Sequence, residues 1–323
     1  MEKVEGIKSV DFLIRASGNG VVNWNGTTPV RGLDGKELNN HMLPKLRGYN
    51  NETGKIKEEN GYRYKKLATE INFKETPLYV SQNCIRHHLF KDQSSDMHFA
   101  SKKGSNLDSK FLLMSISGLL RGYVIPSTQC KRKSALIMTD FVDELGNGNF
   151  EQFGNSGEKD SNSIYSKTTF GETKYNAKGS ISIEDLQFIS LDKKFDRESY
   201  VVKNEVEGHK LAKELTEFLK ELDPLSNSKP LAEFGEYYRK GSIYRECESG
   251  ILINQDGLKI LIKIQLELIE NLSIKQAKGW LQVESLELDY NNSSKMFRLE
   301  KNKMEVLEDL EDDFAVYYVK KGE

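Results

Sequence analysis

The chain has 323 residues, of which 37% are hydrophobic and 30% charged, and its net charge is −2. This composition supports a folded core and excludes a disordered chain. No apolar run approaches the ~20 residues that a membrane span needs, so we expect no membrane partner. The length predicts a single core domain, residues 1–323, with large insertions, or two closely packed parts.

The cysteines and the N-terminal residues bear on the cellular compartment. Cys84, Cys130 and Cys247 are odd in number and far apart, so they offer neither a disulfide framework nor a paired zinc site. Residues 1–11 contain acids and no long apolar stretch, so we expect no signal peptide there. Both features predict a cytoplasmic protein.

The small net charge hides an uneven distribution of charges. No acid lies between Asp108 and Asp140, whereas five bases do: Lys110, Arg121, Lys131, Arg132 and Lys133. The acids gather instead in residues 305–313. Such a pattern favours phosphate binding on one surface and contact with another copy on a second surface. Two ordinary solvated faces would give the same pattern.

The first half of the chain alternates between strand and helix patterns. Residues 10–16 alternate as a strand, and Asn19-Gly20 predicts a hairpin turn after it. Residues 25–76 are rich in Gly, Asn and Lys, which indicates an inserted lobe. Helices are predicted at 81–91 and 110–121, because their apolar residues recur on one side. Residues 135–142 are apolar on both faces and predict a central strand.

The second half begins with a polar, Gly-rich stretch from 146 to 179, which is long enough to be functional or mobile. A strand is predicted at 181–191, and its apolar phase switches at Glu184-Asp185, which suggests a bulge or an edge. Two helices, one around residues 211–222 and one at 256–271, precede a strand at 280–290. The resulting order of strand, helix, strand, strand, helix, strand is the ferredoxin-like, α+β arrangement of RNA-recognition folds.

Two stretches carry the residue types expected of a phosphate-binding surface. Ser81-Gln82-Asn83 opens a helix, whose free amide N–H groups attract phosphate, and Arg86 lies one turn later. Plain capping by Ser81 or Asn83 is the alternative. The acid-free run 129–134 leads into a predicted strand, and cations at a strand entry can follow a nucleic-acid backbone.

No arrangement in the sequence favours catalysis, a metal site or a cofactor. His87 and His88 are adjacent on a helix and cannot easily share one ligand sphere. His-Glu-x-x-His, paired Cys-x-x-Cys and phosphate-loop motifs are absent from the sequence. The aspartates considered for a catalytic role, Asp140 and Asp160, are interpreted as structural.

Several segments together resemble one known family. They are VEGIKSVDFLIRASGNGVVNW at 4–24, NFKETPLYVSQNCIRHHLF at 72–90, RGYVIPSTQCKRK at 121–133, KTTFG at 167–171 and GSISIEDLQFISLDKKF at 179–195. The chain resembles the backbone subunit of CRISPR Cascade complexes, the seventh Cas family of the RAMP superfamily. It is most similar to the version in the minimal type I-F variant.

The resemblance implies that copies polymerise along a guide crRNA and present it for pairing with a target DNA strand. It also implies other Cascade subunits as partners, including the guide-processing endonuclease. An RNA-recognition palm would carry the strand, and a β-hairpin thumb within 146–179 would fold over it. The residues expected to bind RNA are Ser81, Gln82, Asn83, Arg86, His87, Arg121, Lys131, Arg132, Lys133, Ser134, Lys167, Thr168, Thr169 and Phe170.

Alternatives to these expectations remain open at this point. A metal-independent endoribonuclease of the same superfamily would use His, Lys or Tyr for acid–base chemistry, with His87 beside Arg86. A lone RNA-binding module unrelated to CRISPR is the third possibility. Phe170 is expected to wedge against a splayed base, and the alternative is that it pins its loop to the core.

Overall fold

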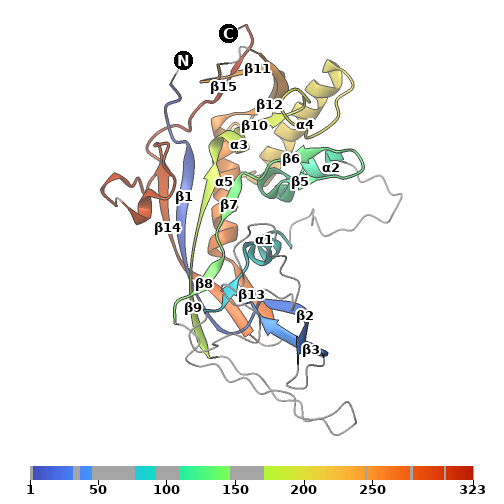
Figure 1. Ribbon diagram of the computed structural model, residues 1–323. Coiled ribbons are helices and arrows are strands. Elements are labelled where there is room, and N and C mark those ends of the chain that lie inside the picture. Colours follow the sequence, from blue (N-terminus) through green and yellow to red (C-terminus); the bar gives the residue numbers. More distant parts are fainter. Residues whose placement is uncertain are drawn as a thin grey trace.

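The computed structural model describes residues 3–31, 37–45, 77–91, 109–145, 171–243, 246–276, 279–301 and 303–322. Its largest feature is an antiparallel sheet with β1 (Ser9–Gly20) near the centre (Figure 1). The strands follow the order β13-β14-β1-β9-β8-β4, and β7 also pairs with β9. The other bounds are β4 Tyr79–Val80, β7 Leu136–Met138, β8 Phe141–Asp143, β9 Glu172–Ser182, β13 Ser273–Gln276 and β14 Gly279–Asn291.

Strand β1 forms because apolar residues alternate along it. Val10, Phe12, Ile14 and Ala16 are buried on the side of the sheet that faces the core. Phe12 lies opposite Gly179 of β9, where a Cβ atom would come within 2.3 Å of the Phe12 ring. A glycine is therefore required at position 179.

The hairpin turn predicted at Asn19-Gly20 is wrong. Strand β1 continues through both residues, with Asn19 opposite Trp280 and Gly20 opposite Gly279 of β14. Partners on both sides extend β1 over twelve residues. A local turn signal is overridden here because ladder hydrogen bonds to two neighbouring strands satisfy more backbone groups.

The predicted helix at 110–121 is divided into two pieces. Helix α2 spans Ser109–Leu113, and a π-helical turn, η3, spans Ser117–Arg121. Between them, the Ser115 hydroxyl donates to the Leu112 carbonyl oxygen over 2.6 Å and accepts from Gly118 N over 2.9 Å. This serine holds the break in place because it replaces backbone hydrogen bonds of a continuous helix.

Two strand predictions also need correction. The segment 135–142 is divided into β7 and β8, which lie beyond β9 toward one margin of the sheet, and Ile137 of β7 is exposed. The predicted strand 181–191 contains a short helix, α3 (Ile183–Gln187), followed by β10 (Phe188–Ser190). The phase switch at Glu184-Asp185 marks this helix, which lets the chain leave one sheet and enter another.

A second antiparallel sheet has the order β10-β12-β11-β15. Its other strands are β11 Ala232–Arg239, β12 Glu248–Ile253 and β15 Tyr318–Lys320. Helix α4 (Glu205–Leu222) packs against β11, and helix α5 (Gln255–Glu270) contacts β14 and α4 (Figure 1). Asn204 and Asn254 cap these helices through their side-chain oxygens. The helices predicted around 211–222 and at 256–271 are confirmed.

The predicted insertions are described only in part. Strands β2 (Trp24–Arg31) and β3 (Glu37–Pro44) pair as a hairpin in the range predicted to be a lobe, and residues 46–76 lie outside the described residues. Most of the predicted thumb range, 146–170, also lies outside them. Its last residues, 172–179, belong to β9 of the large sheet.

The face of the large sheet opposite the core is covered at one end by residues 292–300, which we call the covering segment. Buried Asp11 of β1 accepts hydrogen bonds from the Ser180 hydroxyl (2.6 Å), Asn291 Nδ2 (2.8 Å) and Phe297 N (2.7 Å). Arg298, in the 3₁₀ turn η4 (Arg298–Glu300), donates to Asp289 over 2.7 and 2.8 Å. These buried polar contacts fix the covering segment on the sheet.

No helix in the described part of the chain is long and apolar enough to cross a membrane.

Candidate nucleic-acid interface

Helix α1 (Gln82–Phe90) begins at Ser81, as the sequence predicts. The Ser81 hydroxyl accepts from Cys84 N over 3.4 Å, and Gln82 N donates to the Asp140 carboxylate over 2.9 Å. Ser81 N donates to the Asn23 side-chain oxygen over 2.9 Å. Protein atoms therefore already satisfy several amides at this helix start, which supports the capping interpretation of Ser81. Gln82 and Asn83 are exposed, so both are accessible to a ligand.

Arg86 contacts two other segments of the chain in this region. Its Nη2 atom donates to the Ser134 hydroxyl over 2.7 Å and to the Arg121 carbonyl oxygen over 2.9 Å. The Ser134 hydroxyl in turn lies within hydrogen-bonding distance of the Leu120 and Leu136 carbonyl oxygens. Helix α1, the turn η3 and the entry to β7 are thereby joined through one guanidinium group.

Two arginines are held close together in this region. Burial lowers the pKa of Arg86, and repulsion by the positive charge of Arg121 lowers it further. Both guanidinium groups remain charged in proteins at neutral pH. A phosphate beside this pair would relieve the repulsion between the two positive charges.

The hairpin of β5 (Tyr123–Val124) and β6 (Lys131–Arg132), with the residue that follows it, adds two surface lysines. Lys131 forms an ion pair with Asp196 at 2.5 Å, and Lys133 pairs with Asp185 at 2.7 Å. The side chain of Lys133 is 68% exposed. Surface ion pairs of this kind contribute little free energy, about 0–1 kcal/mol, so a phosphate can displace the carboxylate.

Arg132 has a different environment from its two neighbours. Its side chain is buried, and its guanidinium donates to the carbonyl oxygens of Phe188 (2.5 Å) and Leu186 (3.3 Å). Burial lowers the pKa of Arg132. The expected contact between Arg132 and phosphate does not fit this placement, because alternation along β6 turns every second side chain inward. Arg132 instead joins β6 to the α3–β10 segment.

The comparison with protein families decides the identity of the chain. A family model described as "Type I-Fv CRISPR-associated protein Cas7fv-like" matches residues 6–321. The chain belongs to the Cas7fv-like family. The resemblance to the type I-F variant seen in the sequence is confirmed. No curated protein matches the chain.

The match places the whole candidate interface within the region shared by the Cas7fv-like family. Structure brings together Arg86, Arg121 and Ser134 from separate stretches of sequence. Asn23 and Asp140 are two residues whose contact with the helix start the sequence did not predict. Both contacts span 58 residues, so no local pattern could reveal them.

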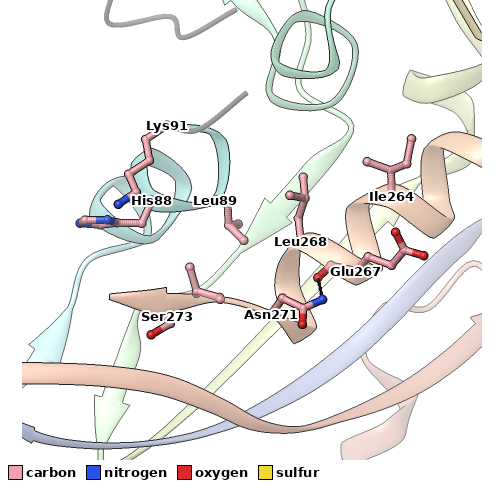
Figure 2. Close-up of a pocket in the computed structure, with 9 residues that line it drawn as sticks. His88, Leu89, Lys91, Ile264, Glu267, Leu268, Asn271 and Ser273 are labelled. Carbon is pink, nitrogen blue, oxygen red and sulfur yellow. Dashed lines mark hydrogen bonds between the residues drawn. The ribbon is translucent and has the colours of Figure 1, made fainter. Parts of the chain in front are cut away.

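His87 lies on α1 beside His88, with ring centroids 5.0 Å apart in an edge-to-face arrangement. His88 and Lys91 line a cavity of about 330 Å³ between the end of α1 and the end of α5 (Figure 2). Asn271 and Ser273 line the same cavity, and in Figure 2 a dashed line marks the hydrogen bond from Asn271 Nδ2 to the Glu267 carbonyl oxygen, over 2.8 Å. This cavity lies at the opposite end of α1 from Ser81.

The remaining predicted residues, Lys167, Thr168, Thr169 and Phe170, lie outside the described residues. Their expected role in a thumb stays a prediction. Within the described ranges, no group of three His, Cys, Asp or Glu side chains could hold a metal ion.

Proposed function

We propose that this Cas7fv-like chain is the guide-RNA-binding backbone subunit of a type I CRISPR surveillance complex. It assembles with other copies along the crRNA, presents the guide for pairing with a target DNA strand, and does not cleave either strand. The observation that carries the proposal is the partly buried Arg86–Arg121 pair beside Ser134. Two neighbouring guanidinium groups fit a phosphate backbone.

The strand order of the large sheet supports a ferredoxin-like palm. Strand β1 is followed by helices α1 and α2 and then by strands β7 and β8. In the sheet, β9 lies between β1 and β8. Strand β9 is followed by helices α4 and α5 and then by strand β14. In the sheet, β1 lies between β9 and β14. Two interleaved β-α-β units of this kind form the split arrangement on which RNA-recognition folds are built.

RNA contact in this proposal comes from side chains around the start of α1 and the β5–β6 hairpin. The proposed contacts are those of Ser81, Gln82, Asn83, Arg86, His87, Arg121, Lys131, Lys133 and Ser134, with Lys167, Thr168, Thr169 and Phe170 from the thumb. Most of these groups recognise phosphate or sugar, which predicts binding with little sequence preference. A subunit that must accept any guide sequence needs this property.

Assembly with other copies is supported by the exposed acids near the end of the chain. Glu305, Glu308, Asp309, Glu311, Asp312 and Asp313 are all exposed. They leave a negative surface that can meet basic side chains of another copy, while Lys131 and Lys133 contact the RNA. Other Cascade subunits, including the guide-processing endonuclease, would join the ends of this assembly.

The test is co-purification of RNA with an oligomer of the full chain. Mixing the purified protein with single-stranded guide RNA should move its elution volume far toward larger size. A chain that remains monomeric at saturating RNA contradicts the proposal. An Asn271→Ala variant, altered at the end of α5 in the cavity beside His88 and Lys91, serves as the matched control and should assemble normally.

A further inference from the structure

Another cavity, which we call the Lys8–Lys295 cavity, lies on the outer face of the large sheet, away from the start of α1. It has a volume of about 290 Å³ and is bounded by the beginning of β1, the edge strand β7 and the covering segment. Its lining includes Lys8, Ser9, Ile137, Ser182, Lys295 and Met296. None of these residues belongs to the candidate interface described above.

The charge of this cavity is positive. Lys8 donates to the Ser294 hydroxyl over 3.4 Å, and within the described chain neither Lys8 nor Lys295 forms an ion pair. The carboxylate that lines the cavity, Asp185, is already paired with Lys133. Asp11 lies beneath the cavity but is fully buried and accepts several hydrogen bonds. The two lysines therefore set the potential at the mouth, which favours an anion.

The walls of the cavity combine hydroxyl groups with exposed apolar side chains. Ile137 is 47% exposed and Met296 is 45% exposed, although both are large hydrophobic residues. Exposed apolar side chains beside lysines and serines suit a ligand that has a charged group and a flat apolar part. A nucleotide within a single strand has both, in its phosphate and its base.

The cavity also continues the candidate interface around the edge of the sheet. Ser134 contacts Arg86, the adjacent Lys133 pairs with Asp185, and Asp185 lines the cavity. Ile137 follows in β7, whose outward side faces the same cavity. A strand held at Arg86 thus has a continuous row of basic and polar groups leading over β7.

A groove nearby on the same face carries a weaker argument. It is lined by Arg15 and Lys178, but these cations are paired with Glu287 (3.4 Å) and Glu300 (2.5 Å). The cations of this groove are neutralised by ion pairs, whereas Lys8 and Lys295 form no ion pair within the described residues.

We propose that the Lys8–Lys295 cavity is a nucleotide subsite for single-stranded nucleic acid. Lys8 and Lys295 bind a phosphate, and Ile137 and Met296 pack against the adjacent base. This inference rests on the proposed function and adds a second contact region to it. The strand can be the guide RNA or the target DNA, since both present the same phosphate and base chemistry.

The experiment compares three variants of the full chain for binding to labelled single-stranded RNA over a range of salt concentrations. The first is Lys8→Gln with Lys295→Gln, and the second is Ile137→Ala with Met296→Ala. The matched control is Lys301→Gln with Lys303→Gln, which removes two exposed lysines from the same part of the chain outside the cavity. The same measurements are repeated with complementary DNA added to the protein–RNA complex.

The lysine variant should flatten the slope of log affinity against log salt by about 0.7 for each phosphate that the protein no longer binds. The apolar variant should weaken binding with the slope unchanged, and the control should match the wild type. A loss confined to RNA alone identifies the guide, and a loss confined to added DNA identifies the target strand. Lys295→Gln alone, at an exposed position, gives the same answer if the double variant folds poorly.

Three outcomes overturn the inference. In the first, both cavity variants bind as the wild type does while Arg86→Ala loses affinity, so the proposed function stands and the subsite falls. In the second, the lysine variant alters self-association without nucleic acid, so the cavity accepts an acidic segment of another copy. A wild-type chain that binds no RNA removes the proposed function and the subsite together.

Discussion

The Arg86 guanidinium donates to the Ser134 hydroxyl over 2.7 Å, which joins helix α1 to the entry of β7 across 48 residues of sequence. The same nitrogen atom reaches the Arg121 carbonyl oxygen over 2.9 Å. Arg86 is therefore a structural residue as well as a proposed phosphate contact, and the two roles must be separated by experiment.

Arg86→Ala should lower both the stability of the RNA-free protein and its affinity for RNA. Hydrogen bonds from a charged group contribute about 1.5–3 kcal/mol, so the free energy of unfolding should fall by about that amount. Urea unfolding and RNA titration measure the two effects. Arg86→Lys keeps the charge and loses the paired hydrogen bonds. If Arg86→Ala lowers stability and leaves RNA affinity unchanged, Arg86 has only the structural role.

Substitutions of the adjacent residues Lys131 and Arg132 should affect different properties, RNA binding for Lys131 and stability for Arg132. Lys131→Ala breaks a surface ion pair and should change stability by less than about 1 kcal/mol, while it flattens the salt slope of RNA binding by about 0.7. Arg132→Met leaves two buried carbonyl oxygens without their donor, which should cost about 1–3 kcal/mol. Equal loss of stability in the two variants would contradict this assignment.

The ion pair between Asp289 and Arg298 should be important for the covering segment. Their side chains are 0% and 8% exposed. Asp289→Asn leaves a buried guanidinium without its counter-charge, which typically costs about 3–5 kcal/mol. Arg15→Gln breaks the exposed pair with Glu287 and should cost no more than about 1 kcal/mol. Thermal and urea unfolding of both variants provide the measurement, and similar losses would contradict the difference in burial.

Glu248 should give a pH-dependent contribution to stability. Burial raises the pKa of Glu248, and the hydrogen bond from Ser190 opposes that shift. Because the folded state holds the proton more tightly, the stabilisation is present at low pH and is lost as pH rises through the folded pKa. Glu248→Gln should therefore gain stability relative to the wild type as pH rises above the ordinary glutamate pKa of about 4.3. The exposed Glu246→Gln is the control, and parallel curves for Glu248→Gln and the wild type would refute the prediction.

The purified chain should not cleave RNA. Labelled guide RNA incubated with the protein should stay intact with magnesium, with manganese and without either ion. Asp140 is engaged at the start of α1 through Gln82 N, so it is placed for capping. Cleavage that disappears in His87→Ala would instead favour the endoribonuclease of the same superfamily.

Local sequence patterns determined several elements of this protein. The start of α1 follows from Ser81, whose hydroxyl caps the helix from three residues away. The period of apolar residues predicts α4 and α5, and alternation predicts β1. These signals act over one or two turns or over one strand, so they are readable without knowledge of the fold. The family resemblance likewise depends on sequence alone and is confirmed.

Tertiary structure decided the features that depend on partners distant in sequence. Asn19-Gly20 extends a strand because β9 and β14 pair with it from both sides. Arg132 turns inward because the carbonyl oxygens of Leu186 and Phe188 need a donor, more than 50 residues away. Lys8 and Lys295 meet at one cavity because β14 returns beside β1. Residue type and spacing set the local conformation, whereas strand pairing and burial determine which charges face solvent.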